Sequence, residues 1–195
     1  MLQKNGKLGC FLTFLLLFNI TAVAQKAQAQ TYQLVTSSQI KVIGTSNLHD
    51  WDMTATNFTC EGKFVTKNGA LQDLSSLTFS LPVANLKGEE KLLTTRAHKA
   101  LKAADNSKIT FKLTKATVIS QQKIINAIGN LTIAGVTNPV NLKIAYVVNA
   151  DESITCKGAE VVNMSTYKIK APSFMLGALK VGDKVTIDIL LKLKK

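Results

Sequence analysis

Residues 185–193 read VTIDILLKL, and this stretch indicates the fold class of the chain. Apolar side chains occupy its odd positions, with Thr186, Asp188 and Lys192 between them. Successive side chains of a strand point to opposite faces, so the pattern predicts a strand with one dry face and one wet face. Such strands are typical of antiparallel sheets with one solvated side.

The same alternation recurs along the chain, and helical periodicity is rare. Odd positions are apolar in residues 77–83 (LTFSLPV) and 109–113 (ITFKL), as are even positions in residues 140–146 (VNLKIAY). A parallel α/β sheet would instead give continuous apolar runs separated by helices. The alternation predicts eight strands, near residues 39–46, 51–65, 74–84, 108–118, 123–134, 138–149, 152–164 and 184–194.

Short polar connections separate these strands. Residues 67–69 (KNG) form a tight turn of the Asn-Gly type, and residues 136–139 (VTNP) and 149–151 (NAD) are further turns. Consecutive strands at this spacing imply hairpins, and eight antiparallel strands can close into a barrel without exposed edges. The prediction is an all-β, eight-stranded antiparallel barrel.

Two segments depart from the strand pattern. Residues 89–104 (EEKLLTTRAHKALKAA) lack Gly and Pro and repeat apolar residues at three- and four-residue steps, which predicts one helix between strands 3 and 4. Residues 171–181 (APSFMLGALKV) are apolar without alternation, and Pro172 and Gly177 argue against a continuous strand. We interpret this second segment as a loop at the barrel mouth that carries Phe174 and Met175.

The first residues resemble an export signal. Lys4 and Lys7 precede an apolar run over residues 11–20, followed by Ala-x-Ala cleavage patterns at residues 22–24 and 27–29. The run is too short to span a bilayer, which needs about 20 residues. We therefore expect a signal peptide over residues 1–24, with cleavage as late as residue 29 as the alternative, and a barrel domain over residues 31–195. The mature protein is then periplasmic or secreted.

Basic residues exceed acidic ones throughout the chain. The full sequence has a net charge of +12, and cleavage after Ala24 removes Lys4 and Lys7 to leave +10. The lysines are scattered singly between apolar strand residues, whereas nucleic-acid binding needs a clustered basic face. We therefore expect no nucleic-acid partner and a solvated surface, with peripheral contact to an anionic membrane as a further option.

No arrangement of residues predicts catalysis. The sequence HDWD begins at His49, but strand alternation places His49 and Trp51 on one face and Asp50 and Asp52 on the other. No HExxH, Gly-x-Ser-x-Gly, glycine-rich phosphate loop or CxxC occurs. We expect a protein that is not an enzyme, with no catalytic residue, no metal site and no cofactor.

Cys60 and Cys156 are the cysteines that remain after the signal. Cys60 is in phase with the apolar residues Phe58 and Phe64, and Cys156 with Ile154, so both thiols are predicted to point inward. An oxidising compartment permits one disulfide between them if their Cα atoms lie within about 7 Å. On remote strands they are instead two small buried hydrophobic residues.

The inward phase of the strands defines the candidate ligand-binding residues. A packed core and an apolar cavity would show the same residues, because an eight-stranded barrel is either filled by side chains or holds one small ligand. Together with the mouth loop, the candidates are Phe58, Phe64, Phe79, Leu81, Phe111, Leu113, Ile133, Leu142, Ile144, Tyr146, Phe174, Met175 and Ile187.

One stretch resembles a known family closely. Residues 129–140 (GNLTIAGVTNPV) are similar to the pattern G-x-L-T-I-x-G-V-T-x-P-V of the YceI-like family of exported lipid-binding proteins. Other segments resemble the family in the same order: residues 38–42 followed by His49, residues 58–64, residues 96–105 running into 108–111, and residues 181–187. The chain departs from the family pattern at residues 106–108 and 166–172, around the expected mouth.

This resemblance implies a lipocalin-like barrel whose apolar pocket holds a polyisoprenoid or a fatty-acyl-like lipid, for transport or storage. Lysines near the mouth would then meet an anionic head group. A barrel without a ligand, acting as a structural or interaction module of the cell envelope, is the alternative function. Each buried methylene contributes about 0.8 kcal/mol, against an association cost of about 4–15 kcal/mol. A chain of about ten or more carbons is therefore expected.

Overall fold

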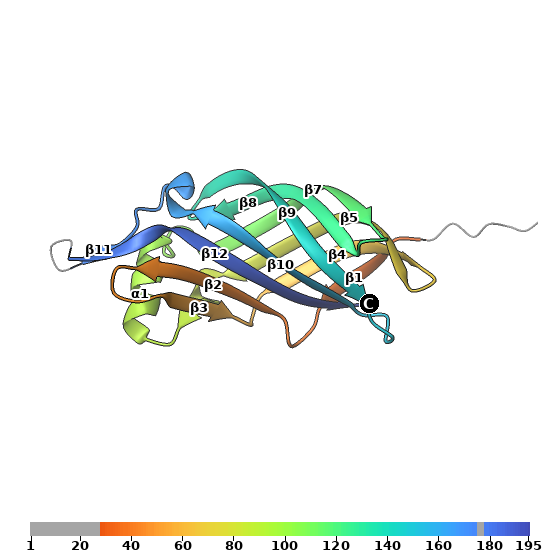
Figure 1. Cartoon of the computed structure of the whole chain (residues 1–195), viewed down its shortest axis with the longest axis horizontal. Coiled ribbons are helices and arrows are strands. Elements are labelled where there is room, and N and C mark those ends of the chain that lie inside the picture. The colour runs from red at the N-terminus through yellow and green to blue at the C-terminus, as the bar shows by residue number, and fades with distance from the viewer. Residues whose placement is uncertain (1–27, 175–177) are drawn as a thin grey trace, which may run out of the picture.

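The computed structural model describes residues 28–174 and 178–195, and the expected signal peptide lies outside them. The described chain forms an elongated, twisted β-barrel with one α-helix at one end (Figure 1). In chain order the elements are β1 (Gln30–Leu34), β2 (Gln39–Ser46), β3 (Trp51–Ala55), β4 (Thr59–Lys67), β5 (Ala70–Pro82), η1 (Val83–Asn85), β6 (Lys87–Gly88), α1 (Lys91–Ala100), β7 (Lys108–Ile119), β8 (Ile124–Ile133), β9 (Val136–Val148), β10 (Ile154–Asn163), η2 (Met164–Tyr167), β11 (Ser173–Phe174) and β12 (Leu179–Lys194).

The sheet closes on itself through β12. One side of β12 pairs with β10, and the other side pairs with β2 and, near the C-terminus, with β1. β1 and β2 occupy the same position of the wall, one after the other along its length. β4 pairs with β1 and β3 pairs with β2, so β4 and β3 share the next position in the same way. The ring β1-β4-β5-β7-β8-β9-β10-β12 is antiparallel throughout. This confirms the predicted all-β, eight-stranded barrel with one helix between its third and fourth wall positions.

The strand bounds differ from the prediction in several places. Residues 136–139, expected as a turn, begin β9, because the chain turns just before them at Ala134 and Gly135, both with positive φ. β12 begins at Leu179, before the predicted residue 184.

The largest differences lie at the start of the chain. β1 was not expected, and the predicted strand over residues 51–65 is divided into β3 and β4. Between β1 and β2 the chain turns at Ser37, which has a positive φ of 76°. The buried hydroxyl of Ser38 donates to Val35 O at 3.0 Å and accepts from Lys192 N at 2.9 Å. Ser38 therefore satisfies backbone groups that the interrupted ladder leaves open.

The end of the barrel that holds the C-terminus is packed. Its largest side chains are almost fully excluded from solvent: Tyr32 and Leu71 are 0% exposed and Phe64 is 1% exposed. The Tyr32 and Phe64 rings meet edge to face with centroids 5.3 Å apart. We call this packed end the floor, defined by Tyr32, Phe64, Leu71, Ile154 and Leu193.

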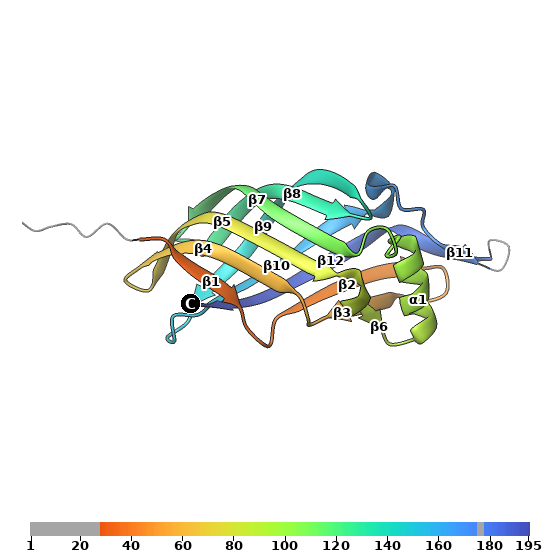
Figure 2. The ribbon, with the colours of Figure 1, turned by 180° about the vertical axis from the view of Figure 1, so that it is seen from behind.

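α1 lies across the opposite end (Figure 2). Its half-buried side chains Leu93, Ala97 and Leu101 pack against the barrel interior. The helix is shorter than the predicted 89–104, because Lys102 takes a positive φ of 52° and the amide of Ala103 donates to His98 O at 3.0 Å. This is the Schellman arrangement that ends helices.

Side-chain hydrogen bonds hold α1 against η1 and β6. The Nε2 atom of His98 lies 2.8 Å from Leu86 O, and the Thr94 hydroxyl accepts from Gly88 N at 3.0 Å. A Cβ atom at Gly88 would lie 2.6 Å from Leu93 Cδ2, so a side chain there would displace Leu93 of the helix. The helix therefore has a fixed position over the barrel end.

The expected mouth loop over residues 171–181 forms a hairpin. β11 pairs with the start of β12, and residues 175–177, including Met175, lie outside the described residues. Asn47 fixes this hairpin to the β2–β3 turn, because its side chain donates to Ala178 O at 2.6 Å and accepts from Lys180 N at 2.9 Å. Over the described ranges, no helix has the length and apolar character needed to cross a membrane.

Candidate functional site

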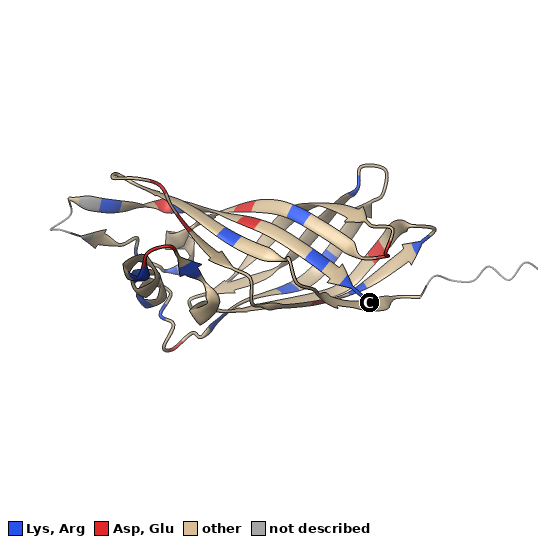
Figure 3. Ribbon diagram, turned by 90° about the horizontal axis from the view of Figure 1, so that it is seen from below, with Lys and Arg blue, Asp and Glu red and all other residues tan. Residues whose placement is uncertain are grey.

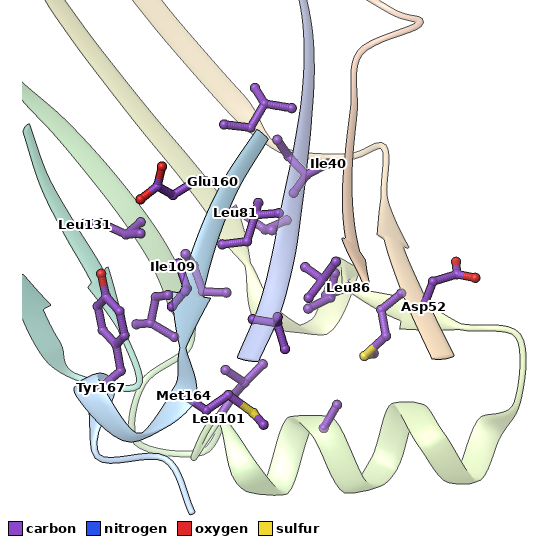
Figure 4. Close-up of a pocket in the computed structure, with 18 of the residues that line it drawn as sticks. Ile40, Asp52, Leu81, Leu86, Leu101, Ile109, Leu131, Glu160, Met164 and Tyr167 are labelled. Atoms are coloured by element: carbon purple, nitrogen blue, oxygen red, sulfur yellow. The ribbon is translucent and has the colours of Figure 1, made fainter. Parts of the chain in front are cut away.

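The barrel encloses a cavity of about 660 Å³ between the floor and α1. This volume falls within the range of small-molecule sites, about 300–1,000 Å³. Inward side chains from the barrel strands line it, among them Leu81, Ile109 and Leu131, and α1 runs across one side of it (Figure 4). On β12 the lining extends from Val181 to Leu191, roughly 33 Å along the strand at about 3.3 Å per residue. The site is therefore long and apolar.

Partial burial of large inward residues distinguishes a hollow barrel from a filled one. Leu113, Leu142 and Ile187 point inward but are only half-buried, because part of each side chain faces the cavity. In a filled barrel these residues would approach the near-complete burial that Leu71 shows in the floor. The interior is thus packed at one end and open along the rest of its length.

The structure brings nine of the thirteen predicted ligand-binding residues together around the cavity. They are Phe64, Phe79, Leu81, Phe111, Leu113, Ile133, Leu142, Ile144 and Ile187. Phe58 and Tyr146 are buried in the core without lining the cavity, and the Phe58 ring packs on Phe79 with centroids 5.3 Å apart. Phe174 lies in β11 and its side chain is not described, and Met175 lies outside the described residues.

Cys60 and Cys156 are both buried, as their inward phase predicted, and they are free thiols. They lie on β4 and β10, two strands that do not pair with each other. Burial raises the pKa of each thiol to about 12, and the nearby Cys156 also raises that of Cys60. Both side chains therefore serve as small hydrophobic residues, and only Cys156 lines the cavity.

The HDWD segment forms the turn into β3 and its first residues. The Ser46 hydroxyl accepts from His49 N at 3.1 Å, and His49 Nδ1 lies 2.7 Å from Asp50 O. Asp52, at the edge of the cavity lining, forms an exposed ion pair with Lys41 at 3.4 Å. Across the part of the chain that the structure describes, no group of three His, Cys, Asp or Glu side chains is placed to hold a metal ion.

Trp51, the single tryptophan of the sequence, lines the cavity from β3. Its indole Nε1 donates to Thr45 O at 3.2 Å, and its ring covers the backbone of Gly44 on the paired strand. A side chain at Gly44 would overlap this ring. Trp51 therefore lies at the cavity wall, where its fluorescence would respond to a molecule bound inside.

The cavity opens beside the start of α1. Its lining includes exposed residues of the β2–β3 turn and of the helix start, namely Leu48, His49, Asp50, Glu89 and Glu90. Leu48 is 69% exposed although it borders the cavity. We call this opening the mouth.

A domain match to the YceI-like family extends over residues 26–193, nearly the whole described chain.

The chain belongs to the YceI-like family. Solved structures agree on the fold. Burkholderia cenocepacia BcnA is 16% identical with a TM-score of 0.67, and the match covers 80% of this chain and 95% of BcnA. A polyisoprenoid-binding domain from Saccharophagus degradans, implicated in plant cell wall breakdown, is 12% identical with a TM-score of 0.63, covering 84% of this chain and 97% of that domain.

A third YceI-like barrel, the YceI protein of Campylobacter jejuni, is 18% identical with a TM-score of 0.56 and covers 71% of this chain and 84% of its own. A comparison with curated protein sequences gives no significant match. At these identities the solved structures establish a shared barrel fold. The ligand of this YceI-like chain must therefore be inferred from its own cavity.

Two polar residues of this YceI-like cavity were not predicted from the sequence. Glu160 of β10 and Tyr167 of η2 both line the wall (Figure 4). Burial raises the pKa of Glu160. Burial also raises the pKa of Tyr167, against a hydrogen bond with Asn138 that lowers it. Alternation counted from Cys156 could have placed Glu160 inside, since both positions are even.

Proposed function

We propose that this protein is an exported carrier that holds one long-chain apolar lipid inside its barrel, for transport or storage. The observation that supports this proposal most directly is the cavity of about 660 Å³, in whose wall large apolar residues are only half-buried. Burial of a lipid chain there recovers about 25 cal/mol per Å² of apolar surface removed from water. An unfilled apolar cavity gives no comparable benefit to a purely structural barrel.

Membership of the YceI-like family supports the same class of ligand. A polyisoprenoid-binding domain shares the fold, and the cavity wall of this chain has the apolar character such a ligand needs. The absence of a nucleophile–base arrangement from the sequence favours binding without catalysis. The Ala-x-Ala patterns after the apolar run of residues 11–20 support export to the periplasm or beyond.

The surface around the mouth supports loading of this lipid from a membrane. Leu48 in the β2–β3 turn is 69% exposed and Leu92 on α1 is 54% exposed. An exposed lysine is close along the backbone in each case: Lys91 precedes Leu92, and the backbone amide of Lys180 donates to Asn47, the neighbour of Leu48. Elsewhere the basic residues are spaced along the strands among acidic ones (Figure 3). We propose transient contact of the mouth with an anionic membrane, at about 1 kcal/mol per lysine near the surface, partly offset by the exposed carboxylates of Asp50, Glu89 and Glu90.

Native mass spectrometry of protein purified from an exporting host tests the carrier function. The expected result is a bound lipid mass and binding of a fluorescent long-chain lipid by the emptied protein. Ile187→Trp places a large ring in the cavity and should abolish this binding. Val161→Trp on the outer face of the neighbouring strand is the matched control and should retain it, because Val161 is 55% exposed.

A ligand-free mass together with no lipid binding would refute the carrier function and favour a structural or interaction module. Equal binding by the Ile187 and Val161 variants would show that the lipid sits outside the barrel. Sedimentation with vesicles of neutral or anionic lipid tests the membrane contact. Leu92→Ser, at an exposed position of α1 outside the cavity lining, should reduce sedimentation with anionic vesicles and leave binding of the soluble fluorescent lipid unchanged.

A further inference from the structure

Two neighbouring residues of β10, Glu160 and Val161, reverse the expected side-chain pattern of the strand. Cys156 and Val162 face the interior in the expected phase, and this phase turns Glu160 into the barrel as well. The neighbouring Val161 points outward and is 55% exposed. A charged residue inside and a valine outside is the opposite of what a one-sided strand favours.

The ladder between β10 and β12 prevents the strand from correcting this reversal. Ten consecutive residue pairs join the two strands without a bulge, and Glu160 is paired with Ile187. A shift by one residue would bring Val161 inside, but it would also expose Cys156 and Val162. The register therefore holds the Glu160 carboxylate at the apolar cavity wall.

Within the described ranges, no hydrogen bond or ion pair reaches the Glu160 carboxylate. The ion pairs found among the described residues lie elsewhere and join Lys41 to Asp52, Lys194 to Asp151 and Lys195 to Glu152. Burial is the cause that raises the pKa of Glu160. A half-buried carboxylate without a partner is unfavourable, and its cost falls when a donor approaches.

Tyr167 places a second polar group in the same region. Its residue is 2% exposed, and η2 holds it there through the Asn138 amide, which donates to Thr166 O at 2.9 Å. Figure 4 shows the Glu160 carboxyl and the Tyr167 hydroxyl on one side of the pocket, with Leu131 between them. The remaining wall near them is apolar, with Ile187 opposite on the paired strand.

We propose that Glu160 selects the head group of the bound lipid, so that the protein prefers lipids whose polar end donates a hydrogen bond, namely alcohols, amides and amines, over carboxylates and phosphate esters. This inference rests on the proposed carrier function. A donor head group satisfies the carboxylate, whereas an anionic head group at the same wall places two like charges together in a poorly solvated site.

Binding of four probes that share one chain tests the inference: oleyl alcohol, oleamide, oleylamine and oleate. Emptied mature protein is titrated with each probe at neutral pH, with the Trp51 fluorescence as readout and calorimetry as a check. The wild type should bind the alcohol, the amide and the amine at least about tenfold more tightly than oleate. A tenfold ratio of binding constants corresponds to one pKa unit of difference in interaction energy. Glu160→Gln should remove most of this preference by tightening oleate binding.

Glu61→Gln is the matched control, because Glu61 lies on the outer face of β4 and the substitution changes the charge by the same amount. It should leave the ratio of affinities as in the wild type. Circular dichroism verifies that each variant is folded. Oleate binding equal to that of the alcohol, or an unchanged ratio of affinities in Glu160→Gln, would refute the role of Glu160 and leave the carrier function intact. No binding of any probe would refute the carrier function and this inference with it.

Discussion

Truncation of one leucine in the cavity wall and one in the floor should have very different effects on stability. Leu71 in β5 is 0% exposed, and Leu71→Ala removes three carbon groups worth about 0.8 kcal/mol each. The void left in a packed region adds to this, so the expected loss is about 3–4 kcal/mol. Leu113 in β7 already faces the cavity, so Leu113→Ala removes fewer contacts and should cost about 1 kcal/mol.

Chemical and thermal unfolding of lipid-free protein, followed by far-ultraviolet circular dichroism, measures both losses. For a chain of this length 1 kcal/mol shifts the Tm by about 2–4 °C, so Leu71→Ala should lower the Tm by about 10 °C and Leu113→Ala by about 3 °C. A saturating lipid should enlarge the difference in Tm between the wild type and Leu113→Ala, because the wild-type leucine then contacts the ligand. Equal losses in lipid-free protein would refute the hollow barrel.

Three further predictions concern single side chains. Ser38→Ala should lower the free energy of unfolding by about 1–3 kcal/mol in chemical denaturation, because it leaves buried backbone groups of the β1–β2 break without a partner; an unchanged midpoint would contradict this role. Cys60 and Cys156, with pKa values of about 12, should resist a thiol reagent in the folded mature protein and both react after unfolding, as counted by mass spectrometry. Glu160 has a raised pKa in the folded state, so its stabilising contribution is complete below the unfolded pKa and is lost as the pH rises through the folded one. The stability of the wild type relative to Glu160→Gln should therefore increase as the pH falls from neutral, and a pH-independent difference would exclude this linkage.

The barrel could be predicted from the sequence because its determinants are local. Alternation along residues 185–193 and the Asn-Gly turn at residues 67–69 each depend on a few neighbouring residues. β1 was missed because the polar residues on either side of Tyr32 give a five-residue strand little apolar signal. The split between β3 and β4 was missed because both pieces stay at one position of the wall.

The cavity could be predicted only in part. Phase identifies which side chains face inward, but the volume left between them depends on how eight strands are spaced around the axis. Tyr146 illustrates this limit, since its inward phase is correct but its place on β9 puts it beside Cys156 and Ile154, in the packed region. Whether an inward residue belongs to the floor or to the wall is a property of the closed barrel.

The unequal packing of the interior connects stability with function. A barrel with an unfilled cavity loses apolar contacts that a solid one would have, and Glu160 adds an unpaired carboxylate to the cavity wall. The floor offsets these losses with a cluster of nearly inaccessible side chains, and the closure of β12 onto β1 joins that cluster to both ends of the described chain. Stability is thus concentrated at the closed end, which leaves the end under α1 free to hold a ligand. A lipid with a donor head group would then give the Glu160 carboxylate the hydrogen-bond donor that it lacks in the described barrel.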